Sequence, residues 1–210
     1  MSILSIFVII PILMLGGLFL SKNMKQIRTV ATVGSALQLI AAIALVVLFC
    51  GKRAAGDTAE MLFMADHVWF QALNIHYAVG VDGVSVAMIL LSAIIVFAGV
   101  FASWKIDPLP KEFFMWLILL SIGVYGFFIS IDLFTMFMFY EVALIPMYLL
   151  IGIWGSGKKY YSAMKLTLML MGGSALLLLG ILGIYFNSSA DGNLTMNILE
   201  IAKNNAIPHT

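Results

Sequence analysis

Charged residues are scarce in this sequence. Only 10% of its 210 residues are Asp, Glu, Lys or Arg, whereas 63% are hydrophobic and the mean hydropathy is +1.10. A soluble domain carries about 25% charged residues, so this composition cannot supply a water-exposed surface. The net charge of +1 also lacks the basic excess that nucleic-acid binding requires. The composition therefore predicts a protein that lies in lipid.

Cysteine is almost absent, and the common cofactor motifs are missing. The single cysteine, Cys50, cannot form a disulfide within the chain, and no His/Cys cluster has metal-ligand spacing. There is no Walker loop, no dinucleotide fingerprint and no ligation pattern for haem or an iron–sulfur cluster. Moving one charge against a membrane potential of about 150–200 mV costs roughly 3.5–4.6 kcal/mol. We therefore expect a partner subunit or a counter-flowing ion to drive any transport.

Long apolar runs dominate what is present. Six windows reach the length of about 20 residues that a helix needs to span a bilayer. They cover residues 2–20, 30–50, 81–104, 112–130, 133–154 and 161–186. Their apolar runs are continuous rather than alternating, which is typical of helices and not of barrel strands. The sequence predicts an all-α integral membrane protein with six transmembrane helices.

The first window differs from a signal peptide. No charged segment precedes it, and its apolar run of about 18 residues is longer than the core of a signal peptide. Lys22, Lys25 and Arg28 follow it in place of a cleavage site. We expect this window to be the first span and Met1 to be the authentic start.

Two aspartates are placed where helices begin. Asp82 opens VDGVSVAMILLS, and Asp132 lies in the tight turn between the fourth and fifth windows. An Asp side chain is a favoured N-cap because it accepts a backbone N–H of the first turn. We predict that these residues cap the third and fifth helices, and that the fourth and fifth form an antiparallel hairpin.

Basic residues are distributed unevenly among the loops. Seven lie in loops one, three and five, namely Lys22, Lys25, Arg28, Lys105, Lys111, Lys158 and Lys159. Three lie on the other side, namely Lys52, Arg53 and Lys203. Because basic loops stay on the inner side, the N-terminus and the tail after the sixth helix are predicted to be outside.

The segment 51–80 is predicted to be one sizeable external loop. Trp69 and Tyr77 are expected to anchor it at the membrane interface. His67 and His76 are nine residues apart and have no third ligand nearby, so exposed loop histidines are favoured over a metal site.

Glu141 points most directly to function. In a helix over 133–154 it would lie about 12 Å from the outer end, too deep for its short side chain to reach water. Intramembrane carboxylates usually mark ion or proton pathways. Pro146 has no N–H to bond the carbonyl of Val142, so a free acceptor beside Glu141 predicts a hydration point. The alternative is a protonated, structural Glu141 hydrogen-bonded between helices.

Lys165 lies about five residues into the sixth window. Its long stem could carry the ammonium to the inner interface. If the ammonium turned inward, it would favour the ionised form of Glu141. At about 4 Å between the two charges and an effective dielectric near 20, the attraction is roughly 4 kcal/mol. Moving the cation away would favour the protonated form, which is a physical basis for a proton switch. Both interpretations of Lys165 stay open.

Small residues occur in two of the spans. They are Gly123, Gly126, Gly172, Gly173 and Ser174. Small residues let transmembrane helices approach closely, so we predict helix contacts at these positions and assign them no chemistry.

The segment IDLFTMFMFYEVALIPMYLLIGIWGSGKKYYSAMKLTLML resembles the antiporter-like chain M family of proton-pumping NADH–quinone oxidoreductase, respiratory complex I. The matching positions are Asp132–Phe134, Phe137–Tyr140, Glu141, Leu144–Gly155, Tyr160–Tyr161 and Lys165, with VDGVS at 81–85. The IPM after Glu141 favours chain M over chains L and N. The resemblance is specific over about residues 81–175.

This resemblance implies an antiporter-like fold of fourteen helices, of which the chain would be the N-terminal part. Residues 1–80 would hold helices one and two and the external loop. Residues 81–186 would hold helices three to six, including the start of the proton-translocating repeat. Residues 187–210 would form an external loop that leads to a missing helix seven. Glu141 would be a proton-channel residue paired with a lysine on that helix.

The resemblance also implies a role and partners. The chain would translocate protons, coupled to quinone reduction elsewhere, as a subunit of NADH:quinone oxidoreductase in a bacterial inner membrane. It would hold no cofactor or metal itself, and FMN, iron–sulfur clusters and quinone would be bound by partner subunits. Its neighbours would be other antiporter-like chains and lipid. Two alternatives stay open: a subunit of a multi-subunit sodium–proton antiporter, and a non-translocating structural or assembly protein.

Overall fold

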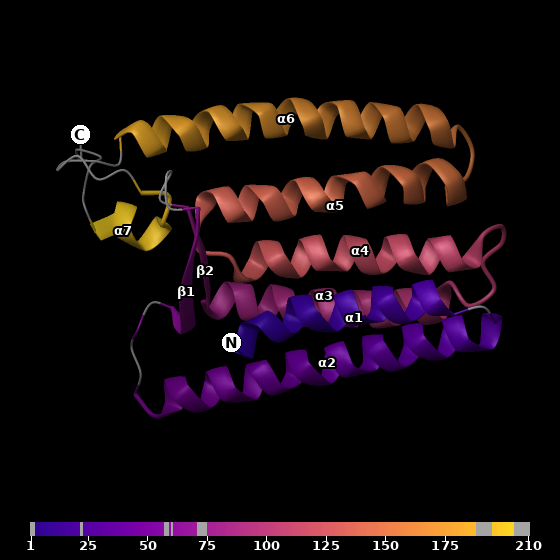
Figure 1. Cartoon of the computed structure of the whole chain (residues 1–210), viewed down its shortest axis with the longest axis horizontal. Helices are drawn as coiled ribbons and strands as arrows, with labels where there is room; N and C mark the ends of the chain where they lie inside the picture. The colour runs from indigo at the N-terminus through magenta and orange to yellow at the C-terminus, as the bar shows by residue number, and fades with distance from the viewer. Residues whose placement is uncertain are drawn as a thin grey trace.

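The computed structural model describes residues 3–21, 23–56, 59, 61–70, 75–187 and 195–203. Six long helices run alongside one another (Figure 1): α1 (Ile6–Leu20, after a 3-10 turn at Ile3–Ser5), α2 (Met24–Ala54), α3 (Gly83–Ala102), α4 (Pro110–Ile129), α5 (Leu133–Trp154) and α6 (Lys159–Asn187). All six are long and apolar enough to cross a membrane. The predicted all-α protein with six transmembrane-capable helices is therefore confirmed.

Helix α2 differs most from its predicted window, because it extends beyond that window at both ends. It begins before Lys25 and continues through Lys52 and Arg53 in its last turn. A hydropathy window stops where charge begins, whereas a helix continues because long basic side chains can reach water from its ends.

Helices α1 to α4 form a bundle, and α5 and α6 extend it on one side (Figure 1). One buried cluster near the N-terminal end of α1 includes Phe7, Leu45, Ile89 and Tyr125, which come from four different helices. Burying such side chains against one another, rather than propensity alone, fixes how these helices pack. Gln38 on α2 donates to the carbonyl oxygen of Phe7 at 3.2 Å.

Both predicted helix caps are present. Asp82 accepts a hydrogen bond from the Ser85 amide at 2.7 Å and begins α3. Asp132 accepts one from the Thr135 amide at 3.1 Å and begins α5 directly after α4. The predicted antiparallel pair of α4 and α5 is thereby confirmed.

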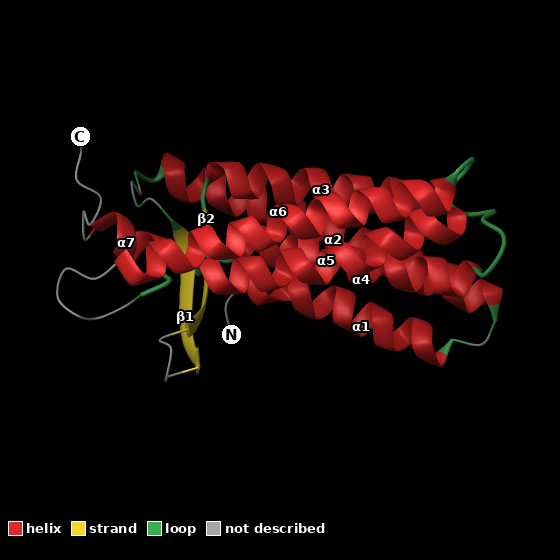
Figure 2. Cartoon of the chain, turned by 90° about the horizontal axis from the view of Figure 1, so that it is seen from above, coloured by secondary structure: helices red, strands yellow, loops and turns green. Residues whose placement is uncertain are grey.

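The segment 51–80 contains more structure than the predicted external loop. Strands β1 (Leu62–Phe70) and β2 (Ile75–Val81) pair antiparallel, with Ala65 opposite Val79. This hairpin lies across one end of the helices (Figure 2). The Ile131 amide donates to the carbonyl oxygen of Ala78 at 2.8 Å, so the hairpin is tied to the turn between α4 and α5.

Tyr77 on β2 is half-buried against the bundle, where burial raises the pKa of its phenol and a hydrogen bond with Ser5 opposes that shift. It therefore packs on protein at the position where a membrane anchor was predicted. The side chains of His67, Trp69 and His76 lie outside the described set, so the predictions made for them stay predictions.

The predicted C-terminal loop is also partly structured. Helix α7 (Ile198–Lys203) follows a stretch that returns to the start of α5, where the Leu133 amide donates to the Met196 carbonyl oxygen at 3.0 Å. Met196 is buried with Tyr185 of α6. This stretch therefore packs against the same end of the α5–α6 pair.

The basic loops gather at one end of the molecule. Loops α1–α2, α3–α4 and α5–α6 meet there, opposite the hairpin (Figure 1). Lys111, in the first turn of α4, donates to the carbonyl oxygens of Phe19 and Ser21 and so caps the end of α1. Lys22 lies outside the described residues. Which end faces inward stays a prediction from the basic residues.

Candidate functional site around Glu141

Close packing of α5 on α4 fixes how α5 is rotated. A Cβ added to Gly126 would overlap the ring of Phe139, and one added to Gly123 would lie 2.8 Å from the Ala143 amide nitrogen. Phe139 and Ala143 are four residues apart and share the side of α5 that faces α4. Glu141 lies between them in sequence, so the helix carries it to the other side.

Glu141 is half-buried, and its Oε1 atom is fully buried. Within the described part of the chain, no hydrogen-bond donor reaches this oxygen. A buried polar group without a partner costs free energy, and an ionised one costs far more. A hydrogen-bond donor from water or from another segment would therefore stabilise this oxygen.

A cavity of about 400 Å³ lies between α5 and α6. Its walls are Met138, Glu141, Val142, Leu144, Ile145 and Tyr148 from α5, and Thr167 and Met171 from α6. Val142 lies in the same wall as Glu141. Pro146, four residues further along α5, has no N–H to donate to the carbonyl of Val142. Glu141 and the Val142 that the sequence analysis placed beside it therefore both line a cavity.

The two helices meet closely at the far end of this cavity. A Cβ added to Gly152 on α5 would lie 3.8 Å from the Cβ of Ala163 on α6. Thr167, one turn beyond Ala163, is on the side of α6 that faces the cavity. Lys165 is exposed and does not line the cavity, so these residues do not bring it to Glu141.

Two of the predicted small-residue contacts are not made within the described residues. A Cβ added to Gly172 or Gly173 would meet no described atom within 4 Å, whereas Gly123 and Gly126 are tightly packed as predicted. Thr167 is the polar cavity residue that the sequence did not single out. Helix α6 is apolar on every side, so its sequence does not show which side faces α5.

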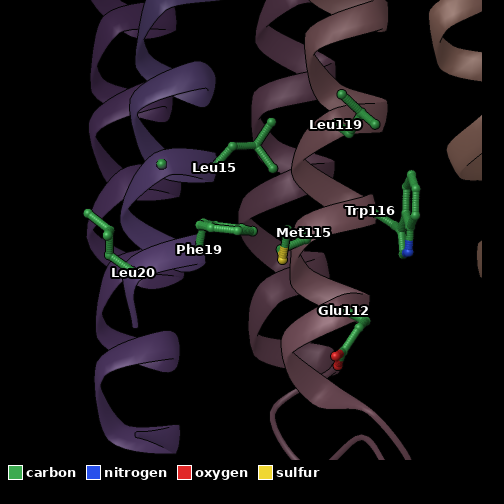
Figure 3. Close-up of a pocket in the computed structure, with 8 residues that line it drawn as sticks. Leu15, Phe19, Leu20, Glu112, Met115, Trp116 and Leu119 are labelled. Carbon is green, nitrogen blue, oxygen red and sulfur yellow. The ribbon is translucent and has the colours of Figure 1, made fainter. Parts of the chain in front are cut away.

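A second cavity of about 630 Å³ lies between α1 and α4. In Figure 3, Leu15 and Phe19 point from α1 toward Met115 on α4, and Glu112 lies near the end of α4. Glu112 is exposed in the first turn of its helix, where the helix dipole favours a negative charge. This carboxylate therefore needs no functional explanation, in contrast to Glu141.

Among the described residues, no three His, Cys, Asp or Glu side chains are grouped as metal ligands would be. The polar members of the Glu141 cavity are one carboxyl and two hydroxyls, those of Thr167 and Tyr148. This set can donate and accept hydrogen bonds and can carry a proton.

Residues 130–208, which include the whole of this cavity, match the family described as NADH:quinone oxidoreductase/Mrp antiporter, transmembrane. The chain belongs to this antiporter-like family. Among its relatives is the chloroplastic NAD(P)H-quinone oxidoreductase chain 4 of Angiopteris evecta, 33% identical over 189 residues, or 88% of this chain and 37% of the relative. Another is NADH-quinone oxidoreductase subunit M of Rhodobacter capsulatus, 32% identical over 136 residues, or 65% and 26%.

Solved structures share the fold of this antiporter-like chain. In respiratory complex I from Thermus thermophilus with bound NADH, the match has a TM-score of 0.77 at 20% identity, over 96% of this chain and 39% of that one. In the Mrp complex from Dietzia sp. DQ12-45-1b, the TM-score is 0.72 at 23% identity, over 97% and 38%. The chain spans about two fifths or less of each protein named here. It is a multi-pass membrane protein of this family.

Proposed function

We propose that this chain forms part of a proton-translocating membrane subunit of NADH–quinone oxidoreductase, with Glu141 as a group that binds and releases the proton. One observation carries the proposal: the carboxyl of Glu141 lies in the middle of a span, with a buried oxygen that has no described partner and a cavity beside it. A carboxyl in such a place is favoured as part of a pathway over a purely structural role.

The physical basis is a change in the charge of one buried group. An ionised Glu141 is costly in a low-dielectric environment unless a cation or water is close, and a protonated one is not. A cation that approaches and withdraws would therefore make the carboxyl release and rebind its proton. Lys165 lies outside the cavity wall, so a lysine on another segment is the first candidate for this cation and Lys165 is the second.

The driving energy would come from neighbouring antiporter-like and redox subunits. Quinone reduction, FMN and iron–sulfur clusters would belong to those partner subunits, with no cofactor in this chain. The relatives from Rhodobacter capsulatus and from chloroplasts suggest an energy-converting membrane, and we favour a bacterial inner membrane among the possibilities.

A second candidate function is that of a subunit of a multi-subunit sodium–proton antiporter. It is favoured by the family description, which includes Mrp antiporters, and by the similarity in fold to an Mrp complex. The two functions differ in the source of energy, because only the first depends on NADH and only the second on sodium.

The test is Glu141→Gln in the full-length protein within its membrane complex. In inside-out vesicles, NADH-driven proton uptake should be abolished or fall by more than tenfold, because Gln cannot bind and release a proton, while the complex still assembles. Glu112→Gln is the matched control, since it removes a carboxyl from a cavity wall at the exposed end of α4.

Each result has a clear meaning. Normal proton uptake in Glu141→Gln would contradict a role for this carboxyl and favour the structural alternative. Proton movement that needs sodium and ignores NADH would favour the antiporter. Loss of uptake in Glu112→Gln as well would show that any carboxyl substitution disturbs the complex.

A further inference from the structure

Many hydroxyl side chains in the spanning helices and at their ends bond to their own helix. Seven donate to a carbonyl oxygen three or four residues earlier, at 2.7–3.1 Å: Ser21, Thr29, Ser35, Ser92, Ser121, Ser130 and Ser174. This bond satisfies a hydroxyl in an environment that offers no other partner.

Thr167 departs from this pattern, as does Thr32 on α2. The hydroxyl of Thr167 makes no hydrogen bond within the described residues, although it lies in the same helix as the back-bonded Ser174. Thr167 is partly buried, and it lines the cavity that holds Glu141. A hydroxyl that leaves its own helix carbonyl unused in the interior of a span is available to a partner in the cavity.

The position of Thr167 along the cavity follows from the helix register. Gly152 of α5 lies near Ala163 of α6, and the two helices are antiparallel. One turn further along each helix, Tyr148 is level with Thr167, and both line the cavity. Glu141 is seven residues from Tyr148, or about 10 Å along the helix axis. The cavity therefore extends from Glu141 toward the end of the bundle that carries the basic loops.

The cavity has the polar groups that a short water chain requires. A water molecule occupies about 30 Å³ in the liquid and needs two to four polar partners, so a cavity of about 400 Å³ has room for several. Glu141 lies at one end, and Thr167 and Tyr148 lie toward the other, with Val142 next to Glu141 in the wall. The remaining walls are apolar, so water would be held along this line and not elsewhere.

We propose that Thr167 is a positioning residue for proton transfer to Glu141, because its hydroxyl holds the water that connects the carboxyl with the basic-loop end of the cavity. The inference rests on the proposed function of Glu141 and adds a residue and a direction of access. A proton would move along hydrogen bonds, each oxygen accepting one proton and passing on another, so Thr167 is unchanged after each transfer.

The test compares Thr167→Val with Thr167→Ser in the full-length protein within its complex. Valine keeps the shape and removes the hydroxyl, so proton uptake per NADH oxidised should fall about fivefold, the equivalent of one net hydrogen bond. Serine keeps the hydroxyl and should restore uptake. Ser174→Ala is the control on the same helix, and it should leave uptake unchanged because that hydroxyl already bonds the Met171 carbonyl.

The outcomes separate this inference from the proposed function. Normal uptake in both Thr167→Val and Thr167→Ala, with loss in Glu141→Gln, would overturn the role of Thr167 and leave that of Glu141 intact. Equal loss in Thr167→Val and Thr167→Ser would also overturn it, since the hydroxyl would not be the cause. Normal uptake in Glu141→Gln would instead reject the function on which the inference rests. If Thr167→Val fails to assemble, Thr167→Ala is measured against Thr167→Ser in the same way.

Discussion

The α1–α4 bundle and the α5–α6 pair differ in how much of their apolar surface is buried inside the protein. In α4, 44% of the most apolar stretch is buried inside the protein, against 11% in α5 and in α6. On α6, Leu176 is 71% exposed, whereas Tyr125 on α4 is fully buried. In water such exposed apolar side chains would favour association, but in a membrane lipid tails or further protein segments cover them at little cost.

This difference shows where chemistry can be placed. The bundle is held by apolar clusters, capped helices and the contact between Gln38 and Phe7. Its buried polar atoms without a described partner, at Arg28, Thr32, Gln38 and Tyr125, include no carboxyl. The α5–α6 pair combines a loosely filled space with Glu141 and two hydroxyls that no described residue engages. A group that must exchange protons needs room and available partners, and only the second region provides both for a buried acid.

The largest change in stability is expected from adding a methyl group where α4 packs closely against α5. Gly123→Ala should destabilise the protein by about 1–3 kcal/mol, because the new Cβ meets backbone atoms of α5 that cannot move without shifting the helix. Gly172→Ala is the matched control on α6. It should be neutral or stabilising by up to about 1 kcal/mol, since alanine is the better helix former and nothing described is in its way.

Thermal unfolding of the purified complex, together with its assembled yield, measures both variants. If Gly123→Ala were as stable as Gly172→Ala, the contact between α4 and α5 would be looser than the structure describes. If Gly172→Ala were the more damaging, the open side of α6 would be packed against another segment in the assembled protein.

A smaller effect is expected from removing a helix cap in the bundle. Asp82→Ala should cost about 1 kcal/mol, because the Ser85 amide at the start of α3 loses the carboxylate that accepts its hydrogen bond. Asp82→Ser should restore most of the loss, since serine is also a good N-cap. The same thermal measurement checks both. An alanine variant as stable as the wild type would mean that water replaces the cap fully.

Local chemistry explains which parts of the fold could be predicted. The six spans follow from continuous apolar runs, and the caps at Asp82 and Asp132 follow from a short polar residue before such a run. The hairpin was missed because its strands of nine and seven residues lie in a segment that hydropathy marks only as a connection. Its pairing with the turn before α5 is a tertiary contact that no local pattern encodes.

The candidate site shows the same limit. Helix geometry places Glu141 near the middle of its helix and next to Val142, and both line the cavity. Thr167 was not, because the side of an evenly apolar helix that faces its neighbour depends on packing. Gly123 and Gly172 look alike in sequence, yet only the first is enclosed.

The smallest effect is expected from substituting Lys165. This substitution tests whether the α5–α6 cavity needs a cation from this part of the chain. Lys165→Ala should change stability by no more than about 0.5 kcal/mol and leave proton uptake near normal, because the side chain is exposed and outside the cavity wall. Lys165→Arg is the control that keeps the charge. Loss of assembly alone would fit a lysine that reaches the interface. A loss of proton uptake as large as in Glu141→Gln, restored by arginine, would mean that this lysine turns inward during turnover and is the cation that switches the carboxyl.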